Sequence, residues 1–207
     1  MTGGHPLREM TPYMHRDTDC IRPLVINLLA GPGSGKSTMA GMIFAELKRR
    51  GGPYSVEIAL EFAKELVWEG RADALANQIY VLGEQFQRIE RVAGKCDIIV
   101  TDSPVLMSAI YRPAKFPDSL NDLALWCFRQ YPSLNVFVDR PDSYEPVGRI
   151  HTLDQARAID QQMLDFLAAH EIAPVTRVRS CHEDAVAIAD RAVQWLDSHG
   201  GQRNAAE

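Results

Sequence analysis

A glycine-rich segment near the start of the chain carries the clearest chemical signal. Residues 24–38 read LVINLLAGPGSGKST, a short apolar run followed by a loop and then a helical pattern. The loop matches the G-x-x-x-x-G-K-S/T template of a phosphate-binding loop (P-loop), except that Ala30 replaces the first glycine. Glycines let successive backbone N–H groups turn toward one point, where they can bind phosphate oxygens. The sequence therefore predicts a site for a nucleoside triphosphate.

The side chains of this loop have separate expected roles. We expect Lys36 to place its ammonium group beside the β- and γ-phosphates of ATP, and the Ser37 hydroxyl to bind Mg²⁺. The helix that follows adds the positive end of its dipole. The expected contacts to ATP from this loop are Gly31, Pro32, Gly33, Ser34, Gly35, Lys36, Ser37 and Thr38.

Two carboxylates follow predicted strands. Asp102 comes after the strand expected at 97–101, where it can hold Mg²⁺ or its water, although Asp also opens Asp-Ser-Pro turns. Glu61 comes after the strand expected at 54–59. It can accept the proton of a substrate hydroxyl as that oxygen attacks the γ-phosphate, or it can simply favour the first turn of a helix. Glu61 and Asp102 therefore compete for the role of catalytic base, and Glu65 is a weaker candidate.

A polar loop before the helix expected at 152–169 contains two arginines. Phosphoryl transfer spreads negative charge over three oxygens, and a guanidinium group above the site would stabilise that charge. We expect a lid here, with Arg149 as the catalytic arginine and Arg140 as a contact to the nucleotide. The alternative is an ordinary solvated loop. Arg157 is assigned to the helix surface.

The longest helical pattern, residues 73–93, has a polar side that could read a nucleobase, although such faces usually meet only water. Its candidate residues are Gln78, Gln85 and Arg88. Trp68 or Tyr80 can stack on a base, with packing in the core or at its rim as the main alternative.

These residues need a scaffold, and apolar runs alternate with helical patterns along the chain. Strands are expected at 24–29, 54–59, 97–101, 134–138 and 174–178. Helices are expected from the loop to Arg50 and at 61–69, 73–93, 152–169 and 183–198, with two shorter ones within 105–131. This alternation predicts an α/β P-loop NTPase fold: a doubly wound, five-stranded parallel sheet with helices on both faces and the site at the carboxyl ends of the strands.

The chain of 207 residues is long enough for one domain, expected at 24–200. Within this domain we expect helical segments at 60–94 and 105–131 and a lid at 139–169. Outside it we expect a flexible extension at 1–23 and a disordered tail at 201–207. A net charge of −5 argues against a protein that coats nucleic acid without specificity. Four widely spaced cysteines suit reduced thiols in the cytoplasm, and no segment is long and apolar enough for a membrane span.

Several stretches resemble one family. INLLAGPGSGKST, EFAKELVWEG, ANQIYVLGEQ, IIVTDSP, and Gly148-Arg149 followed by QARAID are similar to bacteriophage 5-hydroxymethyl-deoxyuridine DNA kinases, within the thymidylate-kinase-like group. The resemblance runs from about residue 25 to residue 178. It implies phosphorylation of the 5-hydroxymethyl group of modified uracil in DNA by ATP with Mg²⁺, a step in thymidine hypermodification in the infected bacterial cell.

Two other functions fit the same residues. One is a small-molecule kinase acting on nucleosides, nucleotides or nicotinamide riboside. The other is a P-loop ATPase that works as a switch, with water as the acceptor.

Overall fold

The computed structural model describes residues 22–141, 152–172 and 175–199. The predicted N-terminal extension lies almost wholly outside these residues, as do the predicted C-terminal tail and Arg149 with most of its loop.

The five predicted strands form one parallel sheet, which confirms the predicted α/β P-loop fold. Its strands are β1 (Leu24–Leu29), β2 (Val56–Ala59), β3 (Ile98–Thr101), β4 (Ser133–Asp139) and β5 (Val175–Arg179). The strand order is β2-β3-β1-β4-β5, with every neighbouring pair parallel. After the central β1 the chain goes to the edge strand β2, returns to β3 beside β1, and then crosses to β4 and β5 on the other side. Such a reversal of winding opens a crevice at the carboxyl ends of the strands, and the glycine loop lies there.

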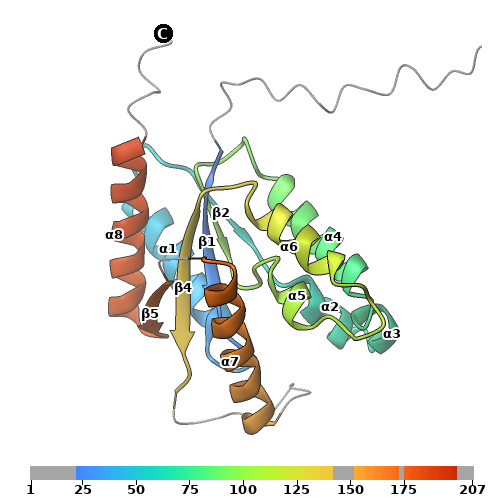
Figure 1. Cartoon of the computed structure of the whole chain (residues 1–207). Coiled ribbons are helices and arrows are strands. Elements are labelled where there is room, and N and C mark those ends of the chain that lie inside the picture. The colour runs from blue at the N-terminus through green and yellow to red at the C-terminus, as the bar shows by residue number, and fades with distance from the viewer. Residues whose placement is uncertain (1–21, 142–151, 173–174, 200–207) are drawn as a thin grey trace, which may run out of the picture.

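Eight helices accompany the sheet within the described residues. They are α1 (Lys36–Arg50), α2 (Phe62–Trp68), α3 (Ala72–Leu75), α4 (Gln78–Glu90), α5 (Met107–Ile110), α6 (Ser119–Phe128), α7 (Leu153–Ala169) and α8 (His182–His199). In Figure 1, α1 and α8 lie on one side of the sheet and α4, α6 and α7 on the other. None of the described helices is long and apolar enough to cross a membrane.

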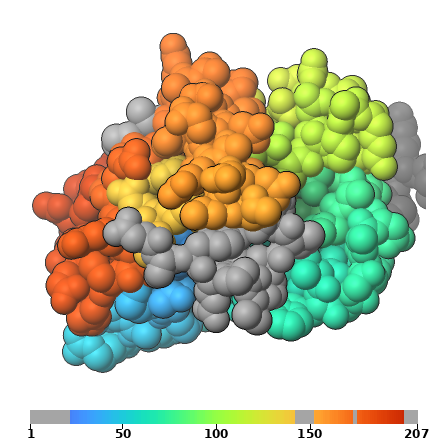
Figure 2. All heavy atoms as spheres, turned by 90° about the horizontal axis from the view of Figure 1, so that it is seen from below, coloured from blue at the N-terminus to red at the C-terminus, as the bar shows by residue number. Residues whose placement is uncertain are grey.

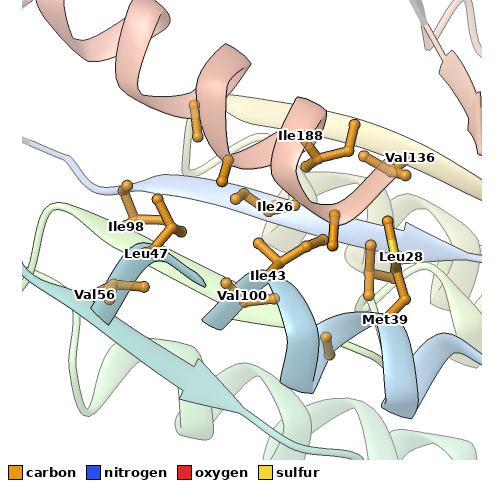
Figure 3. Close-up of a cluster of buried hydrophobic side chains, with 14 of the residues drawn as sticks. Ile26, Leu28, Met39, Ile43, Leu47, Val56, Ile98, Val100, Val136 and Ile188 are labelled. Atoms are coloured by element: carbon orange, nitrogen blue, oxygen red, sulfur yellow. The ribbon is translucent and has the colours of Figure 1, made fainter. Parts of the chain in front are cut away.

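The buried side chains of β1 explain why both faces are covered. Ile26 and Leu28 point into the core beneath α1 and α8, where Figure 3 shows Ile26 beside Ile43 and Leu28 beside Met39. Val25 belongs instead to the core beneath α4 and α6. Because successive side chains of a strand point to opposite faces, a strand that is buried along its whole length needs helices on both sides.

The single helix predicted at 73–93 is wrong, because two helices occupy this stretch. Asn77 has non-helical backbone angles (φ −90°, ψ 85°), and its side chain accepts a hydrogen bond from the Tyr80 N–H. An asparagine at this position satisfies one of the free N–H groups at the start of α4, so the helix begins anew there. The helix predicted at 152–169 is confirmed, and the Thr152 and Gln155 side chains form a capping box at its start.

Candidate active site

The glycine loop connects the central strand to α1. Gly33 and Gly35 have φ values of 82° and 95°, in the left-handed region that favours glycine. Gly35 is also crowded, because a Cβ atom there would lie 2.7 Å from Cβ of Ser180. The Ser180 hydroxyl donates a hydrogen bond to the Gly35 carbonyl at 3.1 Å. The segment between β5 and α8 thus holds the loop where α1 begins.

Lys36 is the first residue of α1, and its side chain folds back along the loop. Its Nζ donates a hydrogen bond to the Gly31 carbonyl at 2.9 Å. Burial lowers the pKa of Lys36, while the nearby carboxylates of Glu61 and Asp102 act in the opposite direction. The ammonium group therefore lies within electrostatic reach of both candidate bases. Three sequence-predicted residues, which follow β1, β2 and β3 along the chain, thus influence one another at one site.

Glu61 lies at the junction of β2 and α2, with an extended backbone and no hydrogen bond from its side chain to the helix. The Glu61 side chain therefore makes no capping hydrogen bond to α2. The Phe62 N–H, the first of the helix, donates to Oε1 of Gln85 at 2.9 Å. Burial raises the pKa of Glu61, the charge of Asp102 raises it further, and Lys36 opposes both. A carboxylate with a raised pKa is a stronger base than an ordinary glutamate.

Asp102 directly follows β3 and is only 2 % exposed. Its Oδ1 has no hydrogen-bond partner in the described part of the chain, and neither does the buried hydroxyl of Ser34 in the glycine loop. Buried polar atoms nearly always have a partner, so these two fit a site that a polar ligand completes.

The donor set also bears on Mg²⁺. Carboxylate and hydroxyl oxygens are ligands that Mg²⁺ prefers, and Ser37 is exposed in the first turn of α1. The described residues contain no cluster of three or more His, Cys, Asp or Glu side chains that could hold a metal ion. Oδ1 of Asp102 and the Ser37 hydroxyl would suit a Mg²⁺ ion, with phosphate and water as its further ligands.

Arg140 lies next to the glycine loop, although not as a lid residue above it. It directly follows β4, and its side chain is 8 % exposed. Its Nε and Nη2 donate to Oδ2 of Asp160 at 3.0 and 2.9 Å, and its Nη1 donates to the Pro32 carbonyl. Oδ1 of the same Asp160 accepts the Gly31 N–H at 2.5 Å. Arg140 and α7 thus hold the first residues of the loop.

The polar side predicted for 73–93 is not a wet surface in its central part. Gln85 is 2 % exposed, and besides binding Phe62 it donates to the Thr101 hydroxyl at 3.4 Å. Gln78 is also buried and donates to the Leu75 carbonyl. Arg88 pairs with Glu65 at 2.7 Å. These contacts help to position α2 and α4, both polar atoms of the Gln85 amide are used within the protein, and Glu65 is already paired.

The two aromatic candidates behave differently. Tyr80 packs edge-on against Phe62, with 5.3 Å between ring centroids, as the packing alternative predicts. Trp68 is 75 % exposed at the end of α2, so packing in the core or at its rim is wrong for this residue.

Viewed from the carboxyl ends of the strands, as in Figure 2, α2–α4 (green to blue-green) form one flank and α7 (orange) faces them. Arg157 lies on the exposed surface of α7, as predicted.

A family model described as an AAA domain matches residues 25–198. The chain belongs to this AAA domain family. No curated protein sequence matches it. Solved structures with a similar fold include deoxyadenosine kinase from M. mycoides, at 12% identity and a TM-score of 0.48, covering 84% of this chain and 98% of that one.

Two further solved structures have a comparable likeness. APS kinase from Mycobacterium tuberculosis has 19% identity and a TM-score of 0.39, covering 73% of this chain and 99% of that one. Shikimate kinase from Acinetobacter baumannii has 15% identity and a TM-score of 0.38, covering 86% and 94%. These likenesses concern the fold alone.

Sequence reasoning missed two residues of this AAA domain. Asp160 left one signal, because it falls on the side of α7 that carries the buried Ala156, Ile159 and Met163, where a charged residue is unexpected. Tyr111 left none. It follows α5, and burial together with the charges of Glu61 and Asp160 raises its pKa. Tyr111 therefore lies within electrostatic reach of both carboxylates.

Proposed function

We propose that this AAA domain is an ATP-dependent kinase that phosphorylates the 5-hydroxymethyl group of 5-hydroxymethyluracil in DNA. The observation that carries the kinase assignment is Glu61. Its carboxylate does not cap its own helix, its pKa is raised, and it lies within electrostatic reach of Lys36. An enzyme that activates an alcohol gains from a base within hydrogen-bond reach of the acceptor hydroxyl, beside the path along which the acceptor oxygen approaches the γ-phosphorus.

The chain's residues divide the chemistry as follows. The backbone amides of the glycine loop and the Lys36 ammonium bind the phosphates of ATP. Glu61 takes the proton from the acceptor hydroxyl while the hydroxyl oxygen bonds to the γ-phosphorus. The bond from that phosphorus to the bridging oxygen breaks, and ADP leaves. Asp102 and Ser37 would hold Mg²⁺, which neutralises phosphate charge when bound.

DNA as the acceptor is supported by where the family resemblance is most specific. EFAKELVWEG contains α2, which begins next to Glu61. ANQIYVLGEQ leads into α4, and the last residue of this stretch is Gln85, which binds the Phe62 N–H. Both stretches therefore lie beside the proposed base. A base within a duplex has to leave the stack before its hydroxymethyl group can approach the γ-phosphate in line.

The exposed side of α2 offers a surface for the neighbours of such a base. Glu61, Lys64 and Trp68 are spaced at i, i+3 and i+7, so they follow one side of the helix. Lys64 is close enough to affect the pKa of Glu61. An exposed indole can stack on a nucleobase of any sequence, and an ammonium group can bind a phosphate.

A small-molecule kinase is the second candidate, and the net charge of −5 favours it because an acidic protein gains no general attraction to DNA. An ATPase switch is the third.

One acceptor comparison separates these functions. ATP labelled in its γ-phosphate is incubated with the full chain and four acceptors: duplex DNA containing 5-hydroxymethyluracil, the same duplex with thymine, free 5-hydroxymethyl-deoxyuridine, and water. Label in the modified duplex alone is the expected result. Label only in the free nucleoside would support the small-molecule kinase, and phosphate release that does not depend on any acceptor would support the switch.

A further inference from the structure

The start of the glycine loop is held by an ion pair that comes from two distant parts of the chain. Asp160 lies 129 residues after Gly31, and Arg140 lies 108 residues after Pro32. One carboxylate oxygen binds the loop N–H, the other binds the guanidinium group, and the guanidinium binds the next loop carbonyl. Two consecutive backbone units of the loop are therefore fixed by one side-chain pair.

The close approach of α7 explains why residue 31 is glycine. A Cβ atom at Gly31 would lie 2.6 Å from the Ala156 carbonyl oxygen and 3.0 Å from Oδ1 of Asp160. The first contact is shorter than real Cβ atoms make and is to a backbone atom, which cannot easily move aside, and the second is tight. Gly31 therefore serves the contact with α7, whereas Gly33 and Gly35 serve the turn of the loop itself.

The pair is also placed to act on the site. Asp160 and Arg140 both contribute, with opposite sign, to the electrostatic environment of Lys36, and the ammonium of Lys36 binds the carbonyl of the same Gly31. Arg140 is nearly fully buried, and its guanidinium is already occupied by Asp160 and by backbone carbonyls. A guanidinium fixed in this way orients its partners and is poorly placed to move toward a phosphate.

We propose that Asp160 is the positioning residue of the phosphate-binding loop, and that Arg140 acts through Asp160 and the loop backbone rather than as a direct contact to ATP. This inference rests on ATP binding by the loop, and it is independent of the acceptor. It replaces the role in nucleotide contact that the sequence predicts for Arg140. The two residues are then one unit, and their loss affects ATP more than the acceptor.

The test uses the full chain and measures the Kd of a fluorescent ATP analogue without any acceptor, together with the melting temperature without nucleotide. Asp160→Ala should raise the Kd about tenfold or more, because the Gly31 N–H and the Arg140 guanidinium both lose their charged acceptor. Asp160→Asn keeps an oxygen for the Gly31 N–H but loses the charge that holds Arg140, so its Kd should lie between those of the unchanged chain and of Asp160→Ala. Asp165→Ala is the matched control, since Asp165 is exposed on the same helix and binds only Gln161 there.

A double-mutant cycle decides how Arg140 acts. If Arg140 works through Asp160, the Arg140→Ala and Asp160→Ala changes together should weaken ATP binding no more than the worse single variant. Additive losses would place Arg140 directly on the nucleotide and overturn the proposal. Tighter ATP binding in Asp160→Ala would also overturn it, because Asp160 would then be a group that phosphate has to displace.

A second pair of variants tests the positioning role if Asp160→Ala does not fold. If Asp160→Ala fails to fold, the Kd of Asp160→Asn and of Arg140→Lys is compared with that of the unchanged chain. The charge pair is lost in the first, and the planar fork of donors in the second. Unchanged affinity in both would contradict the positioning role. A failure of the DNA acceptor assay leaves these binding measurements unaffected, so the two proposals fail separately.

Discussion

The two sides of the glycine loop are built in different ways. On the phosphate side, the backbone of Gly31, Pro32 and Gly35 is held by Asp160, Arg140 and Ser180, which come from three later parts of the chain. On the acceptor side, Glu61 does not cap its helix and Asp102 keeps a buried oxygen without a partner among the described residues.

This difference separates what must be rigid from what must stay available. A cradle for phosphate works best when its amides already point at the ligand, so fixed hydrogen bonds there cost nothing at the moment of binding. A base or a metal ligand has to keep a lone pair free, and a buried free carboxylate destabilises the fold. The acceptor side therefore lowers the stability of the fold so that its carboxylates remain reactive, whereas the phosphate side does not.

The strongest test of the comparison is Lys36→Ala. The lysine links the two sides, because it binds the Gly31 carbonyl and lies within reach of both Glu61 and Asp102. Losing the ammonium should lower phosphoryl transfer by about 10³-fold or more, since it stabilises charge that develops on the phosphates. Circular dichroism and thermal melting should show an intact fold. Normal turnover in a folded variant would remove the loop from the reaction.

Glu61→Gln tests the acceptor side next. Turnover should fall by about 10²-fold if Glu61 is the base. A base works only when deprotonated, so the rate of the unchanged enzyme should rise with pH through a pKa above the ordinary 4.5, and the variant should lack this rise. A near-normal rate would move the role of base to Asp102.

The same variant has an opposite effect on stability. Because the pKa of Glu61 is higher in the folded state, folding takes up a proton near that pKa, and the stability contributed by Glu61 falls as pH rises above 4.5. Glutamine has no such charge, so the melting temperature of Glu61→Gln should exceed that of the unchanged chain at neutral pH, by about 2–4 °C for each kcal/mol gained. The gap should close toward pH 4. If the variant were less stable than the unchanged chain at neutral pH, the Glu61 charge would not be what destabilises the fold.

Trp68→Ala sharpens the acceptor side further. If the exposed indole stacks on a base of the DNA, the KM for modified DNA should rise by about tenfold, while the KM for ATP and the melting temperature stay unchanged. Trp126→Ala is the control, because Trp126 is also exposed but lies on α6 and packs edge-on against Phe86. Equal effects of the two changes would remove the stacking surface.

Much of this arrangement could be predicted from the sequence, because local patterns decide it. Alternating apolar strands and amphipathic helices define the sheet, and the glycine loop with Lys36, together with carboxylates at strand ends, defines where the chemistry gathers. The features that could not be predicted depend on contacts between segments that are distant in the sequence. No local pattern tells that Asp160 reaches Gly31, or that Gln85 turns its amide inward to Phe62 and Thr101. A polar residue on a helix reads as solvated until the partner that buries it is known.

Gln85 gives the smallest of the expected effects, and it tests whether the acceptor side is positioned from behind. Its side chain joins α4 to the N–H of Phe62 and to β3, the two elements that carry Glu61 and Asp102. Gln85→Leu fills nearly the same volume but leaves the buried Phe62 N–H without its acceptor, so unfolding free energy should fall by about 1–3 kcal/mol. Turnover should fall only a few-fold, because Glu61 keeps its carboxylate and loses only its support. Gln87→Leu, on the exposed side of α4, is the control for the stability measurement. If Gln85→Leu matched that control, the N–H would have found another partner, and the position of Glu61 would not depend on α4.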